Sequence, residues 1–212
     1  MCSPLAVERG PGVAMTRMNM AESLFINSTL RVRQLRESIA PTVLRLADST
    51  GVRRVLEVGC GQGVAVDLIM GRFADAHIVA IDLDARMVKR ARRRLNGHHA
   101  SVEVRVGDVC ALPFGDGSFD VIVDFAAVHH VPDWQRALGE IARLLAPGGQ
   151  FLFEDHDVNR HNWLARTVFA HPAERFTALE FAGALAEVGI DVDHPMEDRD
   201  GHFLGRGIKR AS

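Results

Sequence analysis

The sequence contains no tyrosine, and only two of its 25 Lys and Arg residues are lysines. The lack of tyrosine excludes any mechanism that needs a phenolic acid or base. Neither Lys89 nor Lys209 follows a glycine-rich loop, which argues against a P-loop nucleotide-binding protein. A group that takes a proton from a substrate should therefore be a histidine or a carboxylate.

Cysteine is scarce as well, and Cys2, Cys60 and Cys110 show no CxxC spacing. These three thiols cannot form a four-cysteine zinc site or hold an iron–sulfur cluster by themselves. A sparse, odd set argues against a disulfide scaffold and favours a reducing, cytoplasmic location. The histidines form no HxxxH or HExxH pair, so no metal site is expected.

Long hydrophobic runs and a strong charge imbalance are also missing from the 212 residues, whose formal net charge is −2. No apolar run reaches the roughly 18 residues of a membrane span, and the first residues lack the pattern of a secretion signal. Near-neutral charge gives no reason to expect nucleic-acid or membrane binding. The basic run Arg86–Arg94 is interpreted as a solvated helix face. Residues 1–20 are expected to be disordered, with Met15, Met18 or Met20 as alternative starts.

Short β-branched runs alternate with helical segments over most of the chain. The predicted strands are Arg53–Val58, His77–Asp82, Val102–Val106, Phe119–Phe125 and Gln150–Glu154, and the predicted helices are Val64–Phe73, Ala85–Leu95, Trp134–Leu145 and Thr177–Val188. This alternation predicts an α/β fold with a doubly wound, largely parallel sheet and helices on both faces. Ligands of such sheets bind beyond the carboxyl ends of the strands.

The two ends of the chain depart from this alternation. Asp191–His194 and His202–Lys209 are predicted to form an antiparallel C-terminal hairpin, which gives a sheet of seven strands. Glu22–Asp48 is predicted to be helical, with a break or restart at Pro41. Pro147-Gly148-Gly149 is predicted to be a turn in front of the fifth strand.

The first predicted strand runs into a glycine-rich loop, Glu57-Val58-Gly59-Cys60-Gly61-Gln62-Gly63, that precedes a helix. Glycines permit a tight turn and the close approach of a ligand. The dinucleotide pattern G-x-G-x-x-G needs its third glycine one residue later, where Val64 stands, so an NAD-type pyrophosphate is disfavoured. An NAD-dependent oxidoreductase is accordingly a weak alternative.

Acidic residues follow the next two strands. Asp82 ends the second strand, where a carboxylate can accept hydrogen bonds from both ribose hydroxyls. The alternative role for Asp82 is a helix N-cap, which Asp84 fills better. Asp108 follows the third strand and can accept a hydrogen bond from an exocyclic amine. The loop and the two acids together predict a site for an adenosine without a phosphate chain.

Four segments resemble the successive motifs of class I S-adenosylmethionine-dependent methyltransferases: VLEVGCGQG, IVAIDLDARMV, GDVCALPFGDGSFDVIVDFAAVHHVPD and EIARLLAPGGQFLFED. The similarity runs from Arg53 to Asp155, and the chain resembles small bacterial members of the type 11, ubiquinone/menaquinone-methyltransferase-like group. It implies a Rossmann-like fold, S-adenosylmethionine as cofactor, and methyl transfer to a small-molecule acceptor. The cofactor-binding residues that it implies are Glu57, Gly59, Cys60, Gly61, Gly63, Asp82, Leu83, Asp108, Val109, Phe125 and Ala126.

Candidate catalytic bases follow the fourth and fifth strands. They are Asp124, His129, His130 and Asp155, with His156 directly after Asp155 as a further candidate. By resemblance, some O-methyltransferases of this superfamily use a histidine and an aspartate at the matching places. The histidine pair has an alternative role in holding loops together, and Asp124 has an alternative role as the partner of an arginine. Methyl transfer needs mainly proximity and the exclusion of water, and needs a base only when the acceptor loses a proton.

The acceptor pocket is predicted from the N-terminal helix and from the segment after the fifth strand. Phe25, Trp163 and Arg166 are the predicted substrate-binding residues, with core packing as the alternative for Trp163. Residues 21–50 are expected to form a helical lid, and residues 51–212 the methyltransferase domain. The alternative function is a non-catalytic protein that binds S-adenosylmethionine as a regulator or partner, and a homodimer is an open alternative.

Overall fold

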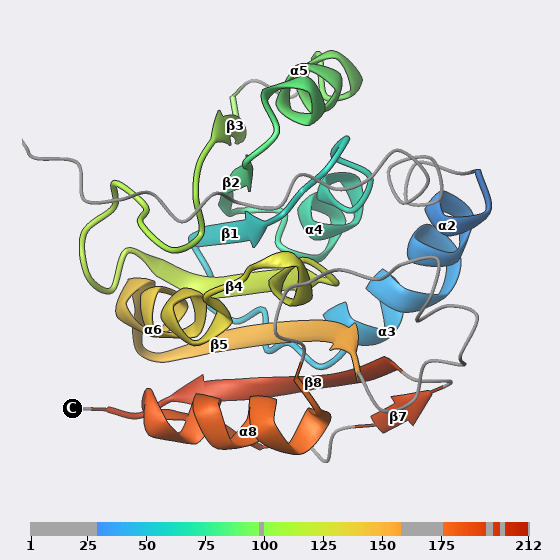
Figure 1. The fold of residues 1–212 in the computed structure, drawn as a ribbon. Helices are drawn as coiled ribbons and strands as arrows, with labels where there is room; N and C mark the ends of the chain where they lie inside the picture. The colour runs from blue at the N-terminus through green and yellow to red at the C-terminus, as the bar shows by residue number, and fades with distance from the viewer. Residues whose placement is uncertain (1–28, 98–99, 158–175, 194–196, 200–201, 212) are drawn as a thin grey trace, which may run out of the picture.

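The structure, a computed structural model, describes residues 29–97, 100–157, 176–193, 197–199 and 202–211. A single sheet of eight strands crosses the molecule in the order β3-β2-β1-β4-β5-β8-β6, with the short β7 paired to β8 (Figure 1). Its strands are β1 (Arg54–Val58), β2 (His77–Asp82), β3 (Val102–Val106), β4 (Phe119–Phe125), β5 (Leu145–His156), β6 (Ile190–Val192), β7 (Glu197–Arg199) and β8 (His202–Lys209). The predicted antiparallel C-terminal hairpin is confirmed, because β8 pairs antiparallel with both β5 and β6.

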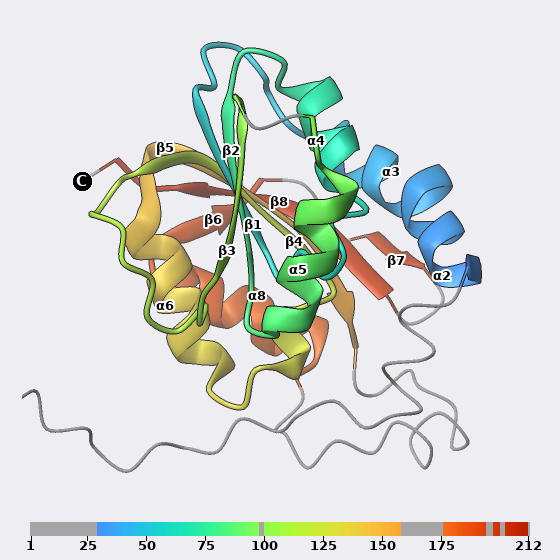
Figure 2. The same ribbon diagram turned by 90° about the horizontal axis from the view of Figure 1, so that it is seen from above.

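Helices cover both faces of this sheet. They are α2 (Thr29–Gln34), α3 (Ala40–Leu44), α4 (Val66–Arg72), α5 (Ala85–Arg94), α6 (Trp134–Leu144) and α8 (Ala178–Glu187). Seen from above, α3, α4 and α5 lie on one side of the strands and α6 and α8 on the other (Figure 2). The doubly wound architecture is therefore confirmed. Within the described residues, no helix combines the length and the hydrophobicity that a membrane crossing requires.

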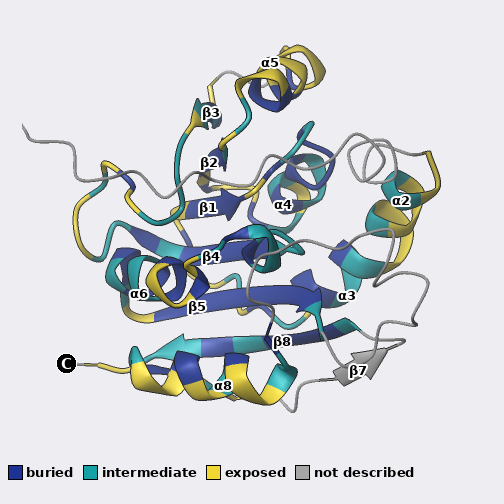
Figure 3. Cartoon of the chain, in the orientation of Figure 1, coloured by how far each residue is buried: buried dark blue, intermediate teal, exposed yellow. Residues whose placement is uncertain are grey.

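The central strands are hydrophobic on both faces because helices bury both faces. Along β1, Leu56 faces the core beneath α6 and α8, whereas Val55 faces the core beneath α3, α4 and α5. On β5, Phe153 and Leu152 divide between the two cores in the same way. Figure 3 shows the resulting buried layer through β1, β4 and β5. The sheet is thus packed between two hydrophobic cores, one on each face.

The direction of the strands decides where a site can form. Strands β1 to β5 run parallel to one another, so their carboxyl ends meet at one edge of the sheet. Strand β8 runs the other way, and its first residue, His202, pairs with His156 at the end of β5. The residues that follow β1, β2, β3, β4 and β5 therefore lie at the same edge as the start of β8.

Strand β5 differs from its prediction, because it begins at Leu145 and ends at His156. Leu145 pairs with Phe119 and Gln150 with Val121, so the residues between Leu145 and Gln150 bulge out opposite a single residue of β4. The predicted Pro147-Gly148-Gly149 turn is this bulge within the strand. Gly148 adopts a φ of 76° there, a conformation that favours glycine. The short strand β7 was not predicted.

The N-terminal helix restarts at Pro41, as predicted, because α3 begins at Ala40 and has Pro41 in its first turn. A π-helical segment, Leu35–Ile39, joins α2 to α3 and ends just before Pro41. A proline is tolerated in the first turn of a helix, and the altered turn before it accommodates its missing N–H. The buried side chains of α3, among them Val43 and Leu44, pack into the core. The lid role of residues 21–50 stays a prediction.

Candidate active site

The loop after β1 uses its glycines for two different purposes. Gly59, Gly61 and Gly63 all have positive φ values, of 67°, 54° and 76°. A Cβ atom on Gly59 would lie 2.2 Å from Cβ of Ala127, and one on Gly63 would lie 3.1 Å from Cβ of Ala91. A Cβ atom on Gly61 would meet nothing within 4 Å. Packing against the end of β4 and against α5 therefore requires Gly59 and Gly63, and Gly61 is the glycine that faces open space.

Asp82 holds this loop against the end of β2. Its carboxylate accepts hydrogen bonds from the N–H groups of Gly61 and Asp84, each at 2.8 Å. The N-cap of α5 is Asp84, whose side chain accepts the N–H of Arg86, as the sequence indicated. Burial raises the pKa of Asp82. The neighbouring Leu83 exposes 44% of its surface, which leaves an apolar side chain uncovered beside the loop.

Glu57 is a buried carboxyl group next to two others. It is 3% exposed, and its Oε2 atom has no hydrogen-bond partner. Burial, and then the negative charges of Asp82 and Asp124, raise the pKa of Glu57 to about 8. A buried acid in negative surroundings is stabilised by a bound cation, since opposite charge favours its ionised form. This part of the sheet edge therefore suits a positively charged ligand.

The other predicted cofactor residues lie after β1, after β3 and at the end of β4. Cys60 is buried, and burial raises the pKa of its thiol well above the usual range, so it is a neutral side chain here. The Asp108 carboxylate accepts the N–H of Cys110 at 2.9 Å and holds the turn after β3. Val109 and Phe125 are partly buried against the two cores.

Ala126 has a left-handed backbone at the end of β4. Its φ of 57° is the only positive value of a non-glycine residue in the described part of the chain. Its N–H donates to the carbonyl oxygen of Glu154 at 2.7 Å, which fixes it against the end of β5. Strained residues of this kind occur preferentially at functional sites.

Two buried aspartates lie at the ends of β4 and β5. Asp124 accepts the N–H of Ala127 at 2.9 Å, and burial followed by the charge of Asp155 raises its pKa well above the usual range. Burial also raises the pKa of Asp155. The group that contributes most after burial to the shift of Asp124 is thus a second carboxyl group rather than an arginine.

His129 lies directly against Asp155. Its Nδ1 atom is 2.5 Å from Oδ1 of Asp155, and its backbone N–H donates to Oδ2 at 3.1 Å. The ring of His130 lies beside that of His129, with 3.9 Å between centroids. The structure therefore brings together the candidate bases Asp124, His129, His130 and Asp155, although they come from two separate segments.

Sequence analysis missed two residues at this edge, Glu154 and His202. Nδ1 of His202 lies 2.5 Å from Oε1 of the buried Glu154. The ring of His156 lies between those of His129 and His202, at centroid distances of 4.8 Å and 4.1 Å. The signal that could have found them is the pairing of the last predicted strand with the fifth. The predicted substrate residues Phe25, Trp163 and Arg166 lie outside the described residues.

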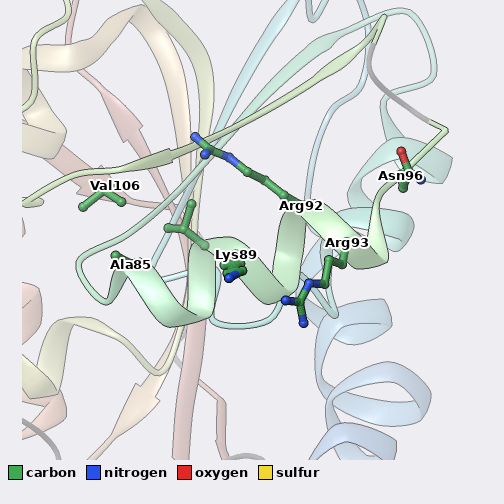
Figure 4. Close-up of a pocket in the computed structure, with 7 residues that line it drawn as sticks. Ala85, Lys89, Arg92, Arg93, Asn96 and Val106 are labelled. Carbon is green, nitrogen blue, oxygen red and sulfur yellow. The ribbon is translucent and has the colours of Figure 1, made fainter.

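A groove beside α5 contains none of the predicted site residues. It is lined by Ala85, Val88, Lys89, Arg92, Arg93, Asn96 and Val106 (Figure 4). The basic run on α5 is only partly a solvated face, because the guanidinium of Arg92 donates twice to the carbonyl oxygen of Val104. The groove is set by the packing of α5 on β3, apart from the polar cluster at the ends of β4 and β5.

Comparison with known proteins identifies the domain. Residues 56–153 match the family described as "Methyltransferase domain". A probable S-adenosylmethionine-dependent methyltransferase of Mycolicibacterium smegmatis is 34% identical over 77% of this chain and 60% of its own length. The chain carries a class I S-adenosylmethionine-dependent methyltransferase domain. The recognition made from the motifs is confirmed.

A further relative supports this methyltransferase domain, and a solved structure supports its fold. A fatty-acid O-methyltransferase of the same organism is 39% identical over 51% of this chain and 39% of its own length. The crystal structure of an S-adenosylmethionine-dependent methyltransferase from Aquifex aeolicus has a TM-score of 0.70 at 18% identity, and covers 91% of this chain and 99% of its own. The chain thus spans about 60% and 39% of the length of the two curated relatives.

The cofactor of this family is S-adenosylmethionine, and the residues present fit it. S-adenosylmethionine carries a sulfonium and an ammonium group, and the buried Oε2 atom of Glu57 has no hydrogen bond. The open space at Gly61 permits the close approach of a ligand. No pyrophosphate needs to be accommodated, in agreement with the early third glycine.

Proposed function

We propose that this protein transfers the methyl group of S-adenosylmethionine to a small-molecule acceptor and releases S-adenosylhomocysteine. The observation that carries the proposal is the contact between His129 and Asp155, 2.5 Å long, at the strand edge that also holds Glu57 and Asp82. The names of the relatives, which include a fatty-acid O-methyltransferase, support a small acceptor. A cytoplasmic location and a homodimer stay predictions.

The cofactor half of the proposal assigns the residues at the ends of β1, β2 and β3. Asp82 accepts hydrogen bonds from the ribose hydroxyls, and Glu57 faces the ammonium group. Asp108 accepts a hydrogen bond from the exocyclic amine of adenine, and Leu83 and Val109 lie against the adenine ring. The remaining assigned residues, Gly59, Cys60, Gly61, Gly63, Phe125 and Ala126, form the wall along the methionine and ribose.

The acceptor half assigns proton transfer to His129. In the tautomer that donates Nδ1–H to Asp155, the Nε2 atom of His129 carries the lone pair that takes a proton. Burial raises the pKa values of both Asp155 and its neighbour Asp124, and the step requires the form in which Asp124 keeps its proton and Asp155 is ionised. In that form Asp155 stabilises the imidazolium by its negative charge. Bound S-adenosylmethionine supplies a methyl group that is already activated by its sulfonium, so displacement breaks the carbon–sulfur bond and leaves both electrons on sulfur. The residues of this chain hold the acceptor in line, exclude water and remove the proton.

Two classes of acceptor distinguish a catalytic base from a residue that only positions the acceptor. A carboxylate is already ionised at neutral pH and needs no base, whereas an alcohol or phenol must lose a proton. The test is the release of S-adenosylhomocysteine from the full chain across fatty acids, alcohols and phenols. We expect His129→Ala to lower turnover of the hydroxyl acceptors and to leave that of carboxylates nearly unchanged.

The same assay, together with calorimetry, distinguishes the proposed enzyme from the alternative, a non-catalytic S-adenosylmethionine-binding protein. Tight cofactor binding with no product release from any acceptor of the panel would favour that alternative. Failure of the wild-type chain to bind S-adenosylmethionine at high micromolar concentration would contradict both functions.

A further inference from the structure

The pairing of β5 with β8 gathers three metal-ligating side chains. His156 and His202 are direct partners across this antiparallel pair. Glu154 lies two residues before His156 on the same strand, so it projects from the same face of the sheet. Glu154, His156 and His202 each offer a ligand atom, and these three atoms lie within 4.8 Å of one another.

The carboxylate of this group is deeply buried. Glu154 is 1% exposed, its Oε1 atom lies 2.5 Å from Nδ1 of His202, and its Oε2 atom accepts no hydrogen bond. The Arg31 guanidinium lies 3.6 Å from Oε2. A buried carboxylate normally has its oxygen atoms hydrogen-bonded or coordinated to a metal, so Oε2 has capacity for one more ligand.

We infer that Glu154, His156 and His202 bind one divalent transition-metal ion of the zinc type. Imidazole nitrogens and a carboxylate oxygen are common ligands of zinc, and three protein ligands leave a fourth position for water or another small ligand. Metal–ligand bonds of about 2.0–2.2 Å bring such atoms within about 4 Å of one another, so side-chain rotations close the site.

Arg31 is the cation with which a metal ion competes. It belongs to α2, and its guanidinium lies against the same Oε2 atom that the inference gives to the metal. Removing this positive charge should strengthen metal binding. A purely structural role of Glu154 and His202 predicts no such gain, since the loss of the ion pair would only loosen α2.

The test uses the full chain after treatment with a chelator. Calorimetric titration with Zn²⁺ is expected to show one equivalent bound, and titration with Co²⁺ an absorption spectrum of nitrogen and oxygen ligands without a thiolate charge-transfer band. His202→Ala and Glu154→Gln are each expected to weaken binding at least tenfold. His77→Ala, which removes an exposed histidine at the other end of the strands, is the matched control and should bind as wild type.

Several results would overturn the inference. They are the absence of stoichiometric binding, equal affinity in His202→Ala and wild type, or a thiolate band that points to Cys60 or Cys110. Arg31→Met is expected to tighten Zn²⁺ binding several-fold, and weaker binding in this variant would also count against the site. Circular dichroism of each variant separates lost binding from lost folding. The inference concerns metal binding alone and does not depend on methyl transfer.

Discussion

The two ends of the ligand-binding edge are built in different ways. At the ends of β1, β2 and β3, the polar groups are held mainly by backbone N–H groups, as Asp82 is by Gly61 and Asp84. At the ends of β4 and β5, side chains hold one another across long stretches of sequence. His129 and Asp155 are 26 residues apart, and Glu154 and His202 are 48 apart.

This difference teaches where each end tolerates change. A backbone N–H donor is present whatever the side chain of its residue. The ends of β1, β2 and β3 therefore keep their geometry as long as their glycines and acidic residues remain. A side-chain pair loses its function when either partner changes, since the remaining buried polar group is left without its hydrogen bond. Single substitutions at the ends of β4 and β5 are therefore expected to disturb the local geometry more than substitutions of residues whose backbone N–H groups make the contacts.

The largest contrast between the two ends is expected from His129→Ala. Removing a positioned base should lower turnover of a hydroxyl acceptor by about 100- to 10,000-fold. Affinity for S-adenosylmethionine should be unchanged, because His129 contacts Asp155 rather than the glycine loop. Steady-state kinetics and calorimetry check the two halves of this expectation. His130→Ala is the control, with a smaller loss, and a parallel loss of cofactor affinity in His129→Ala would contradict the division.

A second prediction sharpens the comparison inside the glycine loop. Gly59→Ala should destabilise the fold by about 3 kcal/mol, because left-handed strain adds to overpacking against Ala127. Gly61→Ala should cost only about 1 kcal/mol, since only the strain applies. Urea unfolding of both variants measures the difference. Equal costs would show that the loop moves away from Ala127 without penalty.

Asp82→Ala should weaken the binding of S-adenosylmethionine and leave the contact between His129 and Asp155 intact. The loss of charged hydrogen bonds to a ligand is worth about 2 kcal/mol, or roughly 30-fold in affinity for S-adenosylmethionine. Turnover at saturating cofactor should change much less than the affinity. Calorimetry and kinetics at high cofactor concentration measure these effects, with the exposed Asp75→Asn as control. A full loss of turnover with unchanged affinity would reverse the assignment of Asp82.

A fourth prediction concerns the pH dependence of stability that Glu57 contributes, which is spread over several pH units. Its pKa in the folded protein is about 8, above the ordinary value of 4.5, so the folded state retains a proton that the unfolded state loses. This stabilisation is present below pH 4.5 and is lost as the pH rises through 8. The slope is at most about 1.4 kcal/mol per pH unit.

Glu57→Gln tests this contribution without the cofactor. We expect stability to fall less steeply in the variant than in wild type across the same range. Urea unfolding at several pH values gives the two curves, and their difference isolates Glu57 from Asp124 and Asp155, whose pKa values are also raised. Parallel curves would show that Glu57 does not titrate in this window.

The predicted bounds of His77–Asp82, Val102–Val106 and Phe119–Phe125 match the structure. The first and third of these strands are largely buried and have nearly continuous apolar runs, whereas Val102–Val106 is an edge strand in which apolar and charged residues alternate. Strand β5 was too short in the prediction, since a bulge carries a Pro-Gly-Gly sequence that is otherwise typical of turns. The π-helical segment before Pro41 has no simple sequence signal.

The sequence by itself determined the fold class and the place of the polar residues that follow β1, β2 and β3, because parallel strands end at one edge of the sheet. Only the tertiary structure decided the cluster of Glu154, His156 and His202. The register that joins them depends on packing across β5 and β8. Gly205 lies opposite Phe153, and a Cβ atom there would come within 2.7 Å of the phenyl ring. A side chain at that position would disturb this contact. No local pattern in either strand predicts the register in which β5 and β8 pair.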